Sequence, residues 1–183
     1  MSMIILGIDP GSRKTGYGVI EVKGKKLRYL DSGTLRYDKE KDFLSRLGVI
    51  HSSCIELVEK YQPDQISFES LIYVKSVTSL AKLAQARGSM IAAFMHTHLG
   101  RVFEYSPNLI KSTVSGHGHA NKESIEKSMK MIFGQNLEFK TNDESDALAI
   151  ALTHALLMGN KSGHSTASST GSTLKNAFKH LGK

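Results

Sequence analysis

The sequence is poor in cysteine and in long apolar runs. Cys54 is the only cysteine among 183 residues, which excludes an internal disulfide and a zinc site built from several cysteines. No apolar run approaches the roughly 20 residues that cross a bilayer, so we expect no membrane span and no membrane partner. Residues 1–11 hold a short apolar stretch without a basic segment before it, unlike a secretory signal. These features predict a cytoplasmic protein.

Acidic residues are outnumbered by basic ones. The chain has 24 Lys and Arg against 17 Asp and Glu, a formal net charge of +7. A basic protein favours a polyanionic partner, most often a nucleic acid. Residues 161–183 contribute four of these lysines and no acid, so the rest of the chain carries only +3. Charge alone therefore leaves nucleic-acid binding open.

The composition predicts one folded domain followed by a tail. Hydrophobic residues make up 40% and charged residues 22% of the chain, as in an ordinary globular domain. Residues 162–173 are almost entirely Ser, Thr and Gly, a composition that cannot bury an apolar core. We predict a folded domain over residues 1–158 and a flexible, basic tail over 159–183.

Hydrophobic periodicity and turn signals predict an α/β domain. Strands are expected at 3–8, 16–22, 27–36, 65–69 and 101–105. Helices are expected at 43–61, 76–98, 107–114, 121–133 and 143–158. Residues 24–26 suit a hairpin turn, which predicts that the first three strands form an antiparallel meander.

Four carboxylates stand at the ends of predicted elements. Asp9 and Glu69 each close a strand, whereas Asp143 and Asp146 share one face of the first turn of the last helix. Asp143 alone could be a helix cap, but a cap explains neither Asp146 nor Asp9. If the fold brings the four together, their repulsion requires cations, and oxygen ligands select Mg²⁺ or Mn²⁺. Two such ions would bind the attacking water and the leaving oxygen of a phosphodiester.

The sequence resembles the RuvC family of Holliday-junction resolvases, within the RNase H-like nuclease superfamily. The matching stretches follow the family order at 5–20, 62–70, 80–88, 103–123 and 143–155. The most specific among them are GIDPGS near the start and DESDALAIA near residue 150. The resemblance implies an RNase H-like mixed five-stranded sheet, flanked by helices on both sides, with an acidic site at its centre.

The resemblance also assigns roles at that site. It implies that Asp9, Glu69, Asp143 and Asp146 are catalytic and hold Mg²⁺, for which Mn²⁺ can substitute, with two ions per subunit during catalysis. It implies that Lys122 takes part in cleavage near the scissile phosphate. The products would carry 5′-phosphate and 3′-hydroxyl ends.

Further basic and apolar residues are candidates for contacts with DNA. The resemblance places Lys111 and Lys122 near the scissile phosphate, and Arg13, Lys75 and Lys82 are expected to contact the phosphate backbone. The family often carries a Phe three residues after the catalytic Glu, and it is thought to open the junction by stacking on a base. Here Ile72 stands at that position and is followed by Tyr73, so either could act as the wedge.

The implied partners are four-way junction DNA, a second copy of the chain in a homodimer, and the RuvA–RuvB branch-migration complex. A family dimer matches the two-fold symmetry of the junction and cuts symmetry-related strands. The alternative is another RNase H-like nuclease that acts on RNA or on flap substrates. A sugar-kinase-like ATPase is disfavoured because it needs two such domains. The roles of the tail and of His117 and His119, which lie in a glycine-containing stretch, are open.

Overall fold

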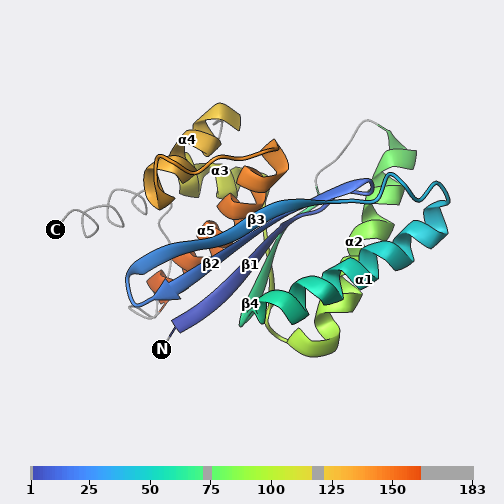
Figure 1. The fold of residues 1–183 in the computed structure, drawn as a ribbon, viewed down its shortest axis with the longest axis horizontal. Helices are drawn as coiled ribbons and strands as arrows, with labels where there is room; N and C mark the ends of the chain where they lie inside the picture. The colour runs from blue at the N-terminus through green and yellow to red at the C-terminus, as the bar shows by residue number, and fades with distance from the viewer. Residues whose placement is uncertain (1, 72–75, 117–121, 162–183) are drawn as a thin grey trace.

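The computed structural model describes residues 2–71, 76–116 and 122–161. Within these residues, helices cover both faces of one central sheet (Figure 1). The strands are β1 (Ser2–Asp9), β2 (Lys14–Lys23), β3 (Lys26–Arg36), β4 (Gln65–Glu69) and β5 (Val102–Tyr105). The helices are α1 (Phe43–Tyr61), α2 (Val77–His98), α3 (Pro107–Ser115), α4 (Lys122–Phe133) and α5 (Asn142–Lys161).

The sheet is mixed, with the strand order β3-β2-β1-β4-β5. The predicted meander is confirmed, since β1, β2 and β3 pair antiparallel. The turn between β2 and β3 contains Gly24 at a φ of 61°, a left-handed conformation that favours glycine. Strand β4 pairs parallel to β1, and β5 pairs parallel to β4. β1 therefore occupies the centre of the sheet, and the predicted fold class is confirmed.

Each face of the sheet has its own apolar core. Leu6 and Ile8 of β1 belong to a cluster with α1 and α2, which also buries Cys54. Ile5 of β1 belongs to a second cluster with α3, α4 and α5. Alternate residues of a strand point to opposite faces, so even positions of β1 face α1 and α2 and odd positions face α5. Figure 1 shows the two groups of helices on opposite sides of the strands.

The last helix is longer than predicted. It ends at Lys161, so residues 159–161 continue α5 beyond the predicted domain boundary at 158. The remainder of the predicted tail, 162–183, lies outside the described residues. No helix in the described part of the chain is both long and apolar enough to cross a membrane.

A polar cluster joins the edge strand β3 to the end of α1. The Tyr61 hydroxyl donates a short hydrogen bond to Asp31 Oδ2, and Lys60 Nζ lies 3.3 Å from the same oxygen. The backbone N–H of Ser32 donates to Asp31 Oδ1 at 2.8 Å. Burial by itself would raise the pKa of Asp31, but the bonds from Tyr61, Lys60 and Ser32 outweigh it and hold that pKa below its usual value.

An Asp31→Asn substitution is expected to lower the free energy of unfolding by about 1 kcal/mol at pH 7, because it removes the charge from this partly exposed cluster. A carboxyl whose folded-state pKa is lowered stabilises the fold above its unfolded pKa of about 3.9 and loses that effect as the pH falls through the folded value. Urea unfolding from pH 7 downward should show the two proteins converging below about pH 4. A difference that stays constant over this range would contradict the assignment.

Candidate active site

Two of the four predicted carboxylates end neighbouring parallel strands. Asp9 is the last residue of β1 and Glu69 the last residue of β4. Ile8 pairs with Phe68, and both face the α1 and α2 side, so the next residue of each strand faces α5. The fold therefore sets Asp9 and Glu69 at adjacent positions on one face of the sheet, along the edge that is formed by the C-terminal ends of the parallel strands β1 and β4.

Three glycines allow α5 to pack directly against the backbone of the sheet. A Cβ on Gly7 would lie 2.2 Å from the Ala147 carbonyl oxygen, and one on Gly18 would lie 2.6 Å from Leu148 Cα. A Cβ on Gly16 would lie 2.0 Å from the carbonyl oxygen of Asp143. Real Cβ atoms are not found at such separations, so only glycine fits at these positions. The helix therefore packs closer to the sheet than it could if any of the three glycines carried a side chain.

This packing brings the start of α5 to the Asp9 end of the sheet. Gly16 is the register partner of Asp9 in the β1–β2 pair, where paired Cα atoms are about 5 Å apart. A Cβ on Gly16 would also lie 3.0 Å from Asp143 Cβ. Asp143 and Asp146 lie in the first turns of α5, on one side of the helix. Four carboxylates far apart in sequence are thus carried by elements that meet at one edge.

The Asp143 carboxylate is paired with a lysine that the sequence analysis does not assign. Lys14 Nζ lies 2.5 Å from Asp143 Oδ2, and the Asp143 side chain is only 14% exposed. The two groups form an ion pair between the start of β2 and the start of α5. The residue that bonds the backbone before α5 is instead Glu144, whose Oε2 accepts from the Lys140 N–H at 3.2 Å. Asp143 is therefore more than a simple helix cap.

The carboxylates suit a hard divalent cation in donor type and in backbone placement. In the described part of the chain, no three His, Cys, Asp or Glu side chains are already grouped closely enough to hold a metal ion. At Asp143, the ion pair with Lys14 gives a physical reason why such a group is not formed, because the carboxylate is directed at an ammonium group. The fit therefore rests on four oxygen ligands, on the register of Asp9 and Glu69, and on the contact between Gly16 and α5.

The predicted lysines near the scissile phosphate lie on the two helices next to α5. Lys111 is half-buried on α3, and Lys122 is the first residue of α4. Both helices pack with α5 in the second apolar cluster, through residues such as Ile110 and Ile125. The structure thus places both lysines on the α5 side of the sheet, the side that Asp9 and Glu69 face.

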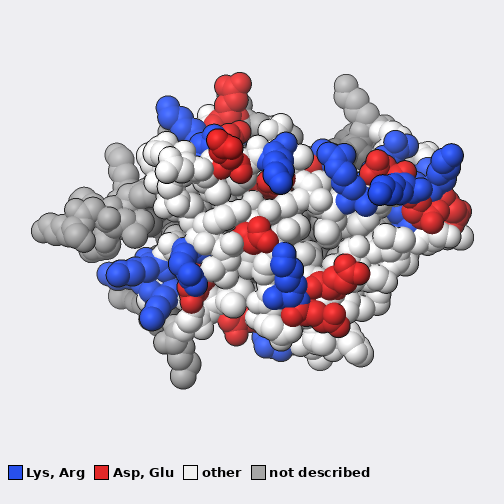
Figure 2. Space-filling view, viewed as in Figure 1, with Lys and Arg blue, Asp and Glu red and all other residues white. Residues whose placement is uncertain are grey.

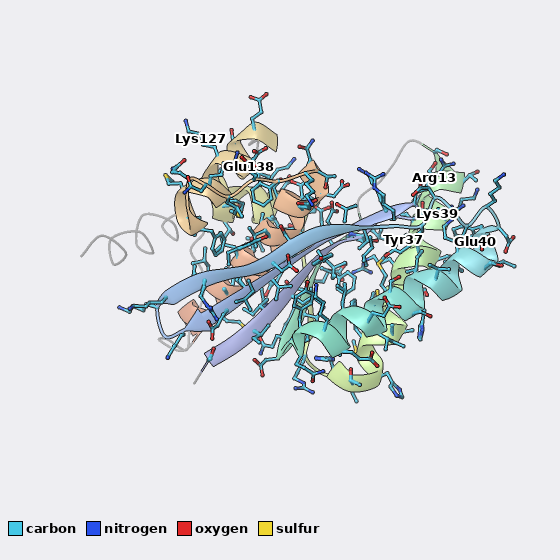
Figure 3. The ribbon with its side chains drawn as sticks, viewed as in Figure 1. Arg13, Tyr37, Lys39, Glu40, Lys127 and Glu138 are labelled. Carbon is cyan, nitrogen blue, oxygen red and sulfur yellow. The ribbon has the colours of Figure 1, made fainter. Side chains whose placement is uncertain are left out.

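The other predicted DNA contacts are more scattered. Arg13 is exposed in the turn after Asp9, and its carbonyl oxygen accepts a 2.8 Å bond from the Tyr37 N–H. Figure 3 shows Arg13 at the same end of the molecule as Tyr37 and Lys39. Lys82 is exposed on α2, with its Nζ 5.6 Å from the centre of the Phe43 ring. This lysine belongs to the α1 and α2 side, across the sheet from α5.

Several predicted contacts fall outside the described residues. These are the wedge candidates Ile72 and Tyr73, the phosphate contact Lys75, and the histidines His117 and His119. They therefore remain predictions from the sequence.

Two polar residues outside the carboxylate set fix the elements around it. His154 of α5 is fully buried, and its ring nitrogens lie 2.6 Å from Gln65 Oε1 and 2.6 Å from the Tyr105 hydroxyl. These contacts join α5 to β4 and β5. Arg87 of α2 pairs with Glu104 of β5 at 2.7 Å and is 13% exposed. Both residues are thus structural in this fold.

Positive charge lies in separate groups rather than on one continuous surface. On the face shown in Figure 2, Lys and Arg side chains gather at the lower left and at the upper right, with Asp and Glu side chains beside them. The net charge of +7 therefore does not by itself indicate one site for a polyanion.

Comparison with known proteins shows one family that matches most of this chain. The family model described as crossover junction endodeoxyribonuclease RuvC matches residues 5–154. The crossover junction endodeoxyribonucleases RuvC of Rhizobium meliloti and Sinorhizobium medicae are 46% and 44% identical to this chain. Each of these matches covers 82% of the chain, and 88% and 89% of the respective relatives.

A solved structure supports the match in three dimensions. RuvC of Thermus thermophilus in complex with a Holliday junction substrate superposes with a TM-score of 0.79 and 31% identity, over 87% of this chain and 96% of that chain. The fowlpox virus Holliday junction resolvase has a TM-score of 0.54 at 14% identity, over 85% of this chain and 99% of that one, which shows a shared fold. From the family match, the high identity and the common fold, we conclude that this chain belongs to the RuvC family of crossover junction endodeoxyribonucleases.

Proposed function

We propose that this protein is an endonuclease that resolves four-way DNA junctions by paired, symmetric nicks. Family membership supports the substrate, since relatives of this chain carry that activity in their names and one of them is complexed with a Holliday junction. The proposal rests mainly on the packing of α5 against Gly16 in this chain. Gly16 is the register partner of Asp9 in the β1–β2 pair, so this packing brings Asp143 to the same place in the sheet. Cys54, buried and unpaired, is compatible with the reducing cytoplasm.

The chemistry that we propose is hydrolysis of a phosphodiester assisted by divalent cations. Asp9, Glu69, Asp143 and Asp146 would hold two Mg²⁺ ions, which activate a water and stabilise the leaving oxygen. The same four carboxylates would fix the positions of the ions relative to the scissile phosphate. Lys122 would neutralise negative charge that develops on that phosphate during cleavage. The hydrolysis would leave 5′-phosphate and 3′-hydroxyl ends.

Lys111 on α3 would bind the same strand beside Lys122. Arg13 and Lys82, which are exposed, and Lys75 would contact the phosphates further away, and Ile72 or Tyr73 would part the bases at the crossover. The RuvA–RuvB branch-migration complex would supply the junction, as the family resemblance implies.

The test is a comparison of substrates under two metal conditions. A mobile four-way junction, a linear duplex, a flap and an RNA–DNA hybrid would each be incubated with the protein in Mg²⁺ and in EDTA. We expect paired nicks on the junction alone, only with Mg²⁺, and we expect ligase to seal the products. Preferential cleavage of the hybrid or the flap would favour the alternative nuclease function instead.

The proposed homodimer would use the outer face of α2. The small residues Ala81, Ala84, Gly88 and Ala92 are spaced along this helix and are exposed. Small residues at helical spacing let two helices approach closely, and a dimer would supply the two active sites that symmetric cleavage requires.

A Gly88→Glu substitution is therefore expected to halve the molar mass measured by light scattering and to abolish paired nicks. A Cβ on Gly88 meets nothing within 4 Å, so the substitution has room within one subunit. Gly48 of α1 is also exposed and equally open, which makes Gly48→Glu the matched control. A Gly88→Glu protein with the native mass would exclude this face as the interface.

A further inference from the structure

Lys14 lies on the same face of the sheet as the start of α5. It is the first residue of β2, and Gly16 and Gly18 of the same strand contact α5. Since strand residues alternate, Lys14 shares their face. Gly11 of the preceding turn packs closely against its backbone, because a Cβ on Gly11 would lie 2.1 Å from the Lys14 carbonyl oxygen. The backbone of Lys14 thus lies against the turn that follows Asp9.

The ammonium of Lys14 neutralises the largely buried carboxylate of Asp143. Lys14 Nζ lies 2.5 Å from Asp143 Oδ2, the side chain of Lys14 is 51% exposed, and that of Asp143 is 14% exposed. Among the described residues, Asp143 Oδ2 is buried and has no hydrogen-bond partner apart from this contact with Lys14. A buried carboxylate oxygen without a hydrogen bond is costly unless a positive charge lies beside it. Lys14 supplies that charge from the solvent side.

The same oxygen is a ligand that a divalent cation would need. An ammonium at 2.5 Å from Oδ2 and a metal ion bound to Oδ2 at its usual distance of about 2.1 Å would repel each other strongly. Lysine has a flexible stem with a strongly hydrated head, so the half-exposed Lys14 can withdraw into solvent. Arrival of the ion and departure of the ammonium are thus one exchange.

We propose that Lys14 is a built-in counter-cation of the metal site, a positioning residue that holds Asp143 until a divalent ion replaces it. The proposal rests on the proposed function, in that Asp143 is taken as a metal ligand. Lys14 neutralises the Asp143 carboxylate before metal binds, and it lowers the affinity of the four carboxylates for the ion. The metal affinity of the free protein is therefore set partly by a residue that does not bind metal.

The test measures metal binding directly, without DNA. Titration of Mn²⁺ followed by electron paramagnetic resonance should show Lys14→Met binding the ion roughly threefold to tenfold more tightly than the native protein at low salt. Lys14→Arg keeps the charge and should restore the native affinity. Lys23→Met removes the same charge from the far end of β2, about 30 Å away, and should leave the affinity unchanged.

Thermal unfolding gives a second readout. Lys14→Met should gain more stability on addition of Mn²⁺ than the native protein does, because tighter binding to the folded state stabilises it more. In an Asp143→Asn background, Lys14→Met should add nothing to Mn²⁺ affinity, since the coupled partner is gone.

The outcomes separate the two proposals. If native protein binds Mn²⁺ and Asp143→Asn weakens that binding, but Lys14→Met binds no more tightly than native, the counter-cation proposal is overturned and the metal site stands. If neither native protein nor Lys14→Met binds Mn²⁺, both are overturned. Equal tightening by Lys23→Met would also overturn the proposal, because it would show an effect of net charge rather than of Lys14.

Discussion

Replacement of Asp9 by Asn should reduce junction cleavage by at least about a thousandfold while leaving junction binding intact. The substitution keeps the shape of the side chain but removes the charge of a proposed metal ligand at the end of the central strand β1. Metal ions stabilise the transition state of phosphoryl transfer by several kcal/mol, and each 1.4 kcal/mol is a factor of ten in rate. Single-turnover cleavage of a synthetic junction, with gel-shift binding in Ca²⁺, measures the two effects separately.

Asp38 offers the matched control for this experiment. It is exposed in the segment between β3 and α1, so Asp38→Asn makes the same chemical change at a residue outside the set of four carboxylates. Its cleavage rate should stay close to that of the native protein. Asp9→Asn cleavage within tenfold of native would remove Asp9 from the catalytic set.

The second large effect concerns packing rather than charge. Gly16→Ala is expected to destabilise the fold by about 3 kcal/mol or more, because the added methyl group would lie 2.0 Å from a backbone oxygen of α5. Backbone cannot move aside as a flexible side chain can, so the first turn of α5 must shift away from β2. Any protein that still folds should also lose cleavage, since Asp143 shifts with that turn. Chemical denaturation and the junction assay give the two numbers.

Gly48→Ala is the control for Gly16→Ala. Gly48 lies inside α1, is exposed, and has nothing within 4 Å of an added Cβ. Alanine is favoured over glycine in a helix by about 0.5–1 kcal/mol, so this variant should be slightly more stable than native. If Gly16→Ala were as stable as Gly48→Ala, the close contact between β2 and α5 would be refuted.

The elements of this fold could be predicted because each has a strong local signal. The helix over 43–61 follows from apolar spacing, and the observed helix has the same bounds, with Asp42 as its N-cap. The parallel pairing of β4 with β1 has no local signal and was not predicted, since the family resemblance implied only a mixed five-stranded sheet. Strand order depends on long-range packing, which a single sequence records weakly.

The site could be predicted only in part. The four carboxylates stood out because they end strands or begin a helix, and the family resemblance assigned their roles. The ion pair of Lys14 with Asp143 was missed, because the two residues are far apart in sequence and a lysine at a strand start is ordinarily solvated. Alternation along β2 was the available signal, since Lys14, Gly16 and Gly18 share a face, but it becomes informative only once α5 is known to cover that face.

The close packing of α5 on β1 and β2 also has a consequence for the order of folding. The meander of β1, β2 and β3 has local contacts and can form early, whereas α5 comes last in the described chain and closes the longest loop. During synthesis on the ribosome, Asp9 and Glu69 are made long before Asp143 and Asp146. The nascent chain therefore lacks two of the four proposed metal ligands until α5 has been made and has docked on the sheet.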